Sequence, residues 1–119
     1  MKCENLDVWK KASRLCVDIY KYFKECKDYG FKDQITRSSL SIPSNIAEGM
    51  EKNYKRGKIR FFEISKGNIA ELITQIYIGI EIEYIDKQIG LRWINKLDEI
   101  SKMLTGLSKY HKKEKYEKK

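Results

Sequence analysis

The 119-residue chain has a single proline, Pro43, only seven glycines, and no long stretch free of charged residues. A membrane-spanning helix needs roughly 20 apolar residues, whereas the longest uncharged stretch here runs from 38 to 47. An acidic residue, Glu4, precedes the first apolar run, so we expect no secretory signal. The sequence therefore predicts a cytoplasmic protein without a membrane partner.

Histidine and cysteine, common metal ligands and nucleophiles, are also scarce. The single histidine, His111, stands in a lysine-rich tail without a neighbouring Asp or Cys, which excludes His-based triads and most metal centres. We expect His111 to be a solvated tail residue. No CxxC spacing occurs, and the cysteines are expected to be small buried apolar side chains: Cys3, Cys16 and Cys26. The sequence predicts neither an enzyme nor a bound cofactor.

Positive charge predominates in the composition. Lys and Arg number 25 against 17 Asp and Glu, giving a formal net charge of +8. Acidic partners such as nucleic acid are therefore the first candidates. At this length, with 41% apolar residues, the chain has room for one compact domain. Its long stretches rich in Glu, Lys, Leu and Ile predict the all-α fold class.

Apolar spacing predicts two helices in the first half of the chain. The first spans residues 5–28, with Asn5 capping its start and Gly30 providing a left-handed stop beyond its end. The second spans residues 33–52 and is kinked at Pro43, which removes one helical hydrogen bond. A break there into two short helices is the alternative. Serines flank the proline and are placed to satisfy freed backbone groups: Ser38, Ser39, Ser41 and Ser44.

The predicted third helix, residues 54–84, is apolar on two sides. Its main stripe comprises Phe62, Ile69, Leu72, Ile73, Ile76, Tyr77 and Ile80. Three further residues, Ile64, Ile78 and Ile82, lie nearly opposite. Such a helix needs two neighbours, so it is either the centre of the monomer's core or packs its second face on another subunit. We favour the second interpretation and predict self-association.

The predicted fourth helix spans residues 86–112, with Asp86 as its N-cap and one apolar face. Residues 113–119 are lysine-rich, lack aliphatic side chains and are expected to form a frayed basic tail. Short connections join the four helices. Residues 1–112 are therefore predicted to form one antiparallel up-down-up-down four-helix bundle.

Two segments carry a distinctive sequence pattern. Residues 34–49 read QITRSSLSIPSNIAEG and residues 60–75 read RFFEISKGNIAELITQ. Together with both ends of the bundle, they resemble the "four helix bundle protein" family, also called 23S rRNA intervening-sequence proteins. Two positions depart from the family pattern, Thr36 and Asn68. The residues that stand at positions of the family motif are Arg37, Ser41, Pro43, Asn45, Glu48, Gly49 and Glu71.

The resemblance implies a small cytoplasmic four-helix bundle that assembles into a ring-like homopentamer. Family members are encoded within intervening sequences of bacterial large-subunit rRNA genes, or elsewhere in bacterial genomes, and their function is mostly unestablished. A related protein, the accessory variability determinant of diversity-generating retroelements, binds nucleic acid and a reverse transcriptase. The resemblance therefore implies a fold and an assembly more than an activity.

The densest run of basic residues, with no acid among them, lies where the second helix joins the third: Lys52, Lys55, Arg56, Lys58 and Arg60. We call these five residues the basic patch. Phosphates need cationic donors along a surface, and an arginine pairs with two phosphate oxygens at once. Arg56 and Arg60 are one helical turn apart. The competing interpretation is a solvated face that keeps the chain soluble.

Three polar motif residues are the other candidates: Asn45, Glu48 and Glu71. Two carboxylates suggest acid/base chemistry or a metal site, but the sequence offers no His partner and no third carboxylate at ligand spacing. An Asn and a Glu on facing helices more often form a hydrogen-bonded network that fixes the register of the helices. We therefore predict a structural role for these residues.

These observations favour a non-enzymatic scaffold that contacts RNA or DNA phosphates through the basic patch and the tail, with little base specificity. The alternative is a protein-interaction scaffold whose ring docks a partner enzyme such as a reverse transcriptase. The choice between RNA, DNA and protein stays open at this point.

Overall fold

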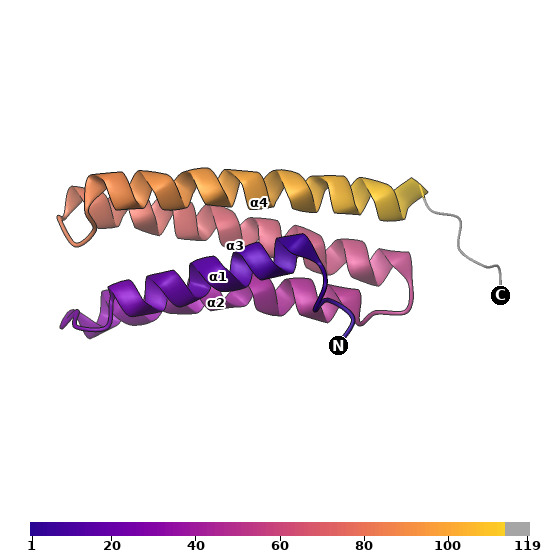
Figure 1. Ribbon diagram of the computed structural model, residues 1–119, viewed down its shortest axis with the longest axis horizontal. Coiled ribbons are helices and arrows are strands. Elements are labelled where there is room, and N and C mark those ends of the chain that lie inside the picture. The colour runs from indigo at the N-terminus through magenta and orange to yellow at the C-terminus, as the bar shows by residue number, and fades with distance from the viewer. Residues whose placement is uncertain (114–119) are drawn as a thin grey trace.

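The computed structural model describes residues 1–113, which contain four helices: α1 (Asp7–Tyr22), α2 (Tyr29–Met50), α3 (Lys55–Glu81) and α4 (Lys87–Lys113) (Figure 1). These residues contain no β-strand, so the predicted all-α fold class is confirmed. The helices run along one long axis, and the molecule measures 54 × 21 × 21 Å.

Each helix packs against two neighbours. α2 contacts α1 and α3, while α4 contacts α3 and α1. The α1–α2 and α3–α4 connections lie at one end of the bundle, and the α2–α3 connection lies at the other (Figure 1). Burying a large aliphatic or aromatic side chain contributes about 1.5–3 kcal/mol. Side chains that fill the shared core include Ile19, Ile35, Ile46, Phe62, Leu72, Ile76, Leu97 and Leu104.

The start and end of α1 differ from the prediction. α1 begins at Asp7 without a side-chain cap, so the cap predicted at Asn5 is wrong. Gly30 is not a left-handed stop, because it lies in the first turn of α2 and no described glycine has a positive φ. Asp28 explains the difference: its carboxylate accepts a hydrogen bond from the Phe31 N–H at 3.1 Å and caps α2 earlier than expected.

α2 is one continuous helix through Pro43, so the alternative of two short helices is wrong. Pro43 lacks the N–H group that would otherwise bond the carbonyl of Ser39, one turn earlier. The hydroxyls of Ser39 and Ser41 donate instead to the carbonyls of Thr36, at 2.8 Å, and Ser38, at 2.7 Å. These serines therefore bond carbonyls of their own helix, but no hydroxyl of residues 1–113 bonds the Ser39 carbonyl that the proline frees, so that part of the prediction is wrong.

The connection between α3 and α4 is a tight turn. Glu83 has a φ of 67°, and the two N–H groups that follow both bond the carbonyl of Gly79. This turn ends α3 at Glu81, before the predicted limit of residue 84. Asp86 then caps α4 as predicted, because its carboxylate accepts two backbone N–H hydrogen bonds at 3.1 Å each.

The last turns of α4 correct the prediction for the C-terminal tail. His111 is not solvated: it is 7% exposed, and its ring centroid lies 5.9 Å from that of Phe62. Because this turn of α4 packs on the aromatic surface offered by α3, the helix continues to Lys113 and does not fray there. The remainder of the predicted tail, residues 114–119, lies outside the described residues.

The cysteines are free thiols inside the described bundle. Cys3 and Cys16 are buried as predicted, and Cys26 is half-buried. Burial raises the pKa of the Cys3 and Cys16 thiols above the ordinary value. They therefore act as small core side chains.

α3 is apolar on two sides, as predicted. Phe62, Leu72 and Ile76 are fully buried. On the other side, Ile64, Ile78 and Ile82 are 38%, 50% and 45% exposed. Tyr77 was placed in the core stripe, but it is 54% exposed because it lies on the flank of the helix. None of the described helices is both long enough and apolar enough to cross a membrane.

Candidate nucleic-acid interface

The basic patch occupies one corner of the bundle, from the end of α2 through the α2–α3 connection into the first two turns of α3. The corner is held by backbone hydrogen bonds, including the bond from the Lys52 N–H to the Gly49 carbonyl at 3.1 Å. Gly49 permits the close approach of the two helices. A Cβ there would lie 3.0 Å from atoms of both Phe61 and Phe62. This motif glycine therefore brings the start of α3 against α2.

Two lysines of the patch stabilise the corner itself. The Lys58 ammonium donates to the Met50 carbonyl at 3.1 Å, which satisfies one of the carbonyls left open at the C-terminal end of α2. Lys52 pairs with Glu48 at 3.7 Å, and its Nζ lies 5.0 Å from the centroid of the Phe61 ring. Both lysine side chains are half-buried. Their first role is therefore structural.

Arg56 and Arg60 are exposed on the outer surface of α3. Neither arginine forms an ion pair with any described residue. The helix start beneath them is uncapped, since Tyr54 offers no side-chain hydrogen bond to the first turn. Tyr54 is itself 59% exposed. The corner thus combines two guanidinium groups, a helix N-terminus without a side-chain cap and an exposed aromatic ring.

The end of α4 extends this basic surface. The Lys55 ammonium donates to the Lys112 carbonyl at 3.5 Å, which places the last turn of α4 beside the first turn of α3. Lys112 and Lys113 are both exposed. The basic tail was expected to contribute from residue 113 onward, and the fold shows that the last turn of α4, with Lys112 and Lys113, adjoins the basic patch.

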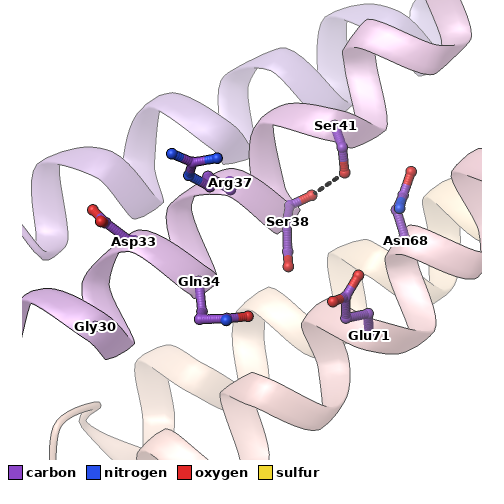
Figure 2. A pocket seen from close by; sticks show the side chains of 8 residues that line it. All are labelled: Gly30, Asp33, Gln34, Arg37, Ser38, Ser41, Asn68 and Glu71. Carbon is purple, nitrogen blue, oxygen red and sulfur yellow. Dashed lines mark hydrogen bonds between the residues drawn. The ribbon is translucent and has the colours of Figure 1, made fainter.

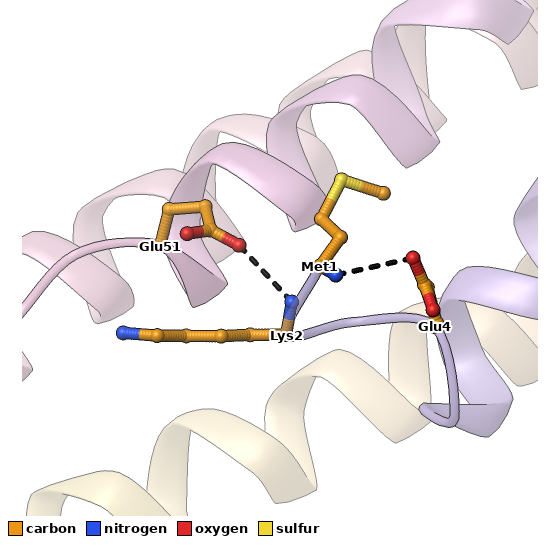
Figure 3. Close-up of polar contacts among 4 residues, drawn as sticks. All are labelled: Met1, Lys2, Glu4 and Glu51. Atoms are coloured by element: carbon orange, nitrogen blue, oxygen red, sulfur yellow. Dashed lines mark hydrogen bonds and ion pairs between the residues drawn. The ribbon is translucent and has the colours of Figure 1, made fainter.

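The acidic residues closest in sequence to the patch have partners of their own. Glu51 accepts a hydrogen bond from the backbone N–H of Lys2 at 3.1 Å (Figure 3). The N-terminal ammonium of Met1 pairs with Glu4 at 3.1 Å, and this hydrogen bond raises the pKa of that amine. The N-terminal segment is thereby tied to the corner.

The predicted Asn and Glu network is only partly present. The Asn45 amide donates to the Ser41 carbonyl at 3.0 Å and to the Asn68 side-chain oxygen at 2.9 Å. Asn45 therefore links α2 to α3, as expected of a residue that fixes helix register. Its partner is Asn68, one of the two positions that depart from the family pattern.

The two glutamates do not join this network. Glu48 is exposed and pairs with Lys52 in its own helix. Glu71 is also exposed, on the outer side of α3. Their long side chains reach solvent more readily than the Asn45 amide, which explains why the predicted Asn and Glu pairing does not form.

An open groove of about 590 Å³ runs along the outer side of the α2–α3 pair. Figure 2 shows Arg37 and Ser41 on α2 and Glu71 on α3 around it, so three motif residues share this groove. The other lining residues are Gly30, Asp33, Gln34, Ser38 and Asn68. Residues 1–113 contain no group of three His, Cys, Asp or Glu side chains arranged to hold a metal ion.

Comparisons with known proteins agree with this architecture. No curated protein matches the chain. The structure is similar to the crystal structure of a protein of unknown function from the S23 ribosomal protein family of Bacteroides thetaiotaomicron. The two share 28% sequence identity with a TM-score of 0.79, over 86% of this chain and 98% of that one. Residues 4–106 match the family model described as 23S rRNA-intervening sequence protein. The chain therefore belongs to the 23S rRNA-intervening sequence protein family.

Proposed function

We propose that this protein is a non-enzymatic, cytoplasmic scaffold that binds RNA or DNA through its phosphates, with the basic patch as the contact surface. The observation that carries the proposal is the exposure of Arg56 and Arg60 at the uncapped start of α3. Because Lys52 and Lys58 hold the corner beneath them, the two arginines sit on a rigid support.

The chemistry of this corner suits a phosphate backbone. A guanidinium group donates two parallel hydrogen bonds to a phosphate, and residues four apart on a helix lie side by side. The N-terminus of α3, which has no side-chain cap, adds backbone N–H donors and the positive end of the helix dipole. Tyr54 offers a ring on which an unpaired base can stack. None of these groups reads a base edge, so we expect little sequence specificity.

Self-assembly is part of the proposal. We infer that the helices form an antiparallel up-down-up-down bundle and that the chain assembles into the ring-like homopentamer implied by the family resemblance. Each added copy would contribute another basic patch to the same particle. Several weak phosphate contacts then act together at a high effective concentration, which increases affinity without new chemistry.

The test is a double variant, Arg56→Ala/Arg60→Ala, measured for binding to labelled structured RNA and to duplex DNA. The matched control is Arg92→Ala/Lys96→Ala, which removes two exposed cations with the same spacing from α4. The control lies at least about 24 Å from Lys112 at 1.5 Å per helical residue. Both variants lose the same formal charge, so any difference between them reports position.

We expect the patch variant to bind at least about tenfold more weakly than the wild type at 100 mM salt, and the control to change affinity by much less. Equal losses in the two variants would show that only the net charge matters and would refute the assigned surface. No detectable binding by the wild type would redirect the search to a protein partner such as a reverse transcriptase.

A further inference from the structure

A groove in two sections follows the joint between α1 and α4, which lie side by side (Figure 1). Its first section, of about 420 Å³, lies between residues 10–15 of α1 and residues 96–99 of α4. Its second section, of about 440 Å³, lies between residues 5–8 and residues 103–110 of α4. We call the two sections together the α1–α4 groove. Its α4 side extends over about 21 Å at 1.5 Å per helical residue.

The first section of the groove is basic. Four exposed cations line it: Lys10, Lys11, Arg14 and Lys96. Lys11 pairs with Glu99 across the groove at 3.6 Å. Lys10, Arg14 and Lys96 form no ion pair with any residue of 1–113. Like charges along one groove repel one another, and carboxylates placed among them would relieve that repulsion.

The second section is lined mainly by apolar side chains, which include Leu6, Met103, Leu107 and Tyr110. Tyr110 is 60% exposed. Gly106 lies among them in the interior of α4, where a glycine costs about 1 kcal/mol relative to alanine. No neighbouring side chain or helix comes within 4 Å of the position that a Cβ would take there, so the packing of the bundle does not require a glycine. Gly106 therefore leaves room for the close approach of another molecule.

We propose that the α1–α4 groove binds an amphipathic helix of a partner protein, which places apolar side chains on the second section and carboxylates on the basic section. Asp7 beside the apolar section disfavours a carboxylate there, so the groove also sets the direction in which the helix lies. This surface is separate from Arg56 and Arg60. The inference therefore does not depend on whether the basic patch binds nucleic acid.

The groove suits a protein helix better than a nucleic-acid strand. A strand carries a phosphate about every 3.4 Å and would bring phosphates against Glu99 and Asp7 as well as against the cations. The apolar side chains of Leu6, Met103 and Leu107 offer a phosphate no donor. A protein helix can place each carboxylate at a cation and an apolar side chain elsewhere. Another copy of this chain is a poor source of the carboxylates, because its formal charge is +8.

The test uses a labelled helical peptide of about 15 residues, which is long enough to span the groove. One half of its binding stripe carries leucines and the other half carries glutamates, and a second peptide has lysines in place of the glutamates. Fluorescence anisotropy measures the binding of each peptide to the full chain. One variant is directed at each section of the groove. Arg14→Glu reverses a charge in the basic section, and Gly106→Gln fills the open space in the apolar section.

Each variant has a matched control outside the groove. Lys87→Glu makes the same charge change at an exposed residue at the start of α4. Gly67→Gln makes the same substitution at a glycine of α3 that, like Gly106, has no neighbour within 4 Å of its Cβ position. Thermal unfolding followed by circular dichroism verifies that each variant folds. Both glutamine variants are expected to be at least as stable as the wild type, because glycine disfavours a helix.

We expect the wild type to bind the glutamate peptide with a Kd below about 100 μM and to bind the lysine peptide at least about tenfold more weakly. Arg14→Glu should weaken binding of the glutamate peptide at least about tenfold and Gly106→Gln at least about fivefold, whereas each control should change it less than about twofold. A wild type that does not bind the glutamate peptide, or that binds both peptides equally, would overturn the proposal. Equal losses in a variant and its control would do the same.

Two further measurements identify a different occupant. If Arg14→Glu weakens binding to duplex DNA more than Lys87→Glu does, the groove belongs to a nucleic-acid surface. If Gly106→Gln changes the mass of the particle in light scattering and Gly67→Gln does not, the groove joins copies of this chain. Either result would overturn the assignment of the groove to a partner protein.

Discussion

A hydrogen bond between the side chains of Asn45 and Asn68 links α2 to α3, and its removal gives a quantitative prediction. Asn45→Ala deletes a donor that serves both the Ser41 carbonyl and the Asn68 oxygen. Both asparagines are half-buried, so water compensates only in part. We expect a loss of about 1–2 kcal/mol in the free energy of unfolding. For a chain of this length that corresponds to a decrease in Tm of roughly 4–8 °C.

A double-mutant cycle isolates the link between the helices. Asn68→Ala removes only the acceptor and leaves the Asn45 bond to Ser41, so we expect a loss of about 1 kcal/mol. The double variant should then cost less than the sum of the two single variants by about 0.5–1 kcal/mol. The assay is urea denaturation followed by circular dichroism at one fixed protein concentration, because self-assembly would make stability depend on concentration.

Strict additivity, with a coupling below about 0.3 kcal/mol, would refute the idea that this pair fixes the register. The same variants distinguish structure from binding. Asn45→Ala is expected to leave the affinity of the folded protein for RNA unchanged, since Asn45 lies outside the basic patch. A specific loss of RNA affinity without a loss of stability would contradict the structural role.

Two further predictions concern packing and pH. Gly49→Ala should lower the free energy of unfolding by about 1–3 kcal/mol, because the added Cβ would lie 3.0 Å from atoms of Phe61 and Phe62. Gly106→Ala, which has open space around it, should raise the free energy of unfolding by up to about 1 kcal/mol. Thermal unfolding measures both changes, and an unchanged stability in Gly49→Ala would show that α2 and α3 separate easily. The Phe31 N–H and the Tyr84 hydroxyl lower the pKa of Asp28, so its stabilising contribution is present above about pH 4 and is lost as the pH falls through the lowered pKa. In urea titrations, the wild type should therefore be more stable than Asp28→Ala above about pH 4, and this difference should shrink at lower pH. A stability difference that does not change with pH would show that the ionisation of Asp28 is not its cause.

The helices were predictable because apolar spacing and the Asp86 cap act locally. The end of the first helix was not, since Asp28 caps the following helix and also accepts a hydrogen bond from Tyr84, which is distant in sequence. His111 was misplaced for a similar reason. A lysine-rich segment carries no sign that Phe62 lies within reach across the bundle.

In the candidate site too, features set by neighbouring residues were predictable, whereas contacts between residues distant in the sequence were not. The cluster of basic residues was visible in the sequence, but the assignment of Lys52 and Lys58 to the support of the corner required their contacts with Glu48 and Met50. The role of Asn68 was hidden because its partner lies on another helix. The sequence thus identified the candidate residues. It did not show which of them are held by contacts within the fold and which are exposed to a ligand.

The central claim is that this protein binds nucleic-acid phosphates through exposed cations, and a salt series tests it most directly. The measurement is the affinity of the wild-type protein for labelled structured RNA and for duplex DNA between about 50 and 200 mM salt. We predict that the logarithm of the binding constant falls linearly with the logarithm of the salt concentration. In Arg56→Ala/Arg60→Ala that slope should be shallower by about 2, or about 0.9 for each lost phosphate contact on duplex DNA. Affinity that is independent of salt, or no better than about 10⁻⁴ M at the lowest salt, would contradict the claim.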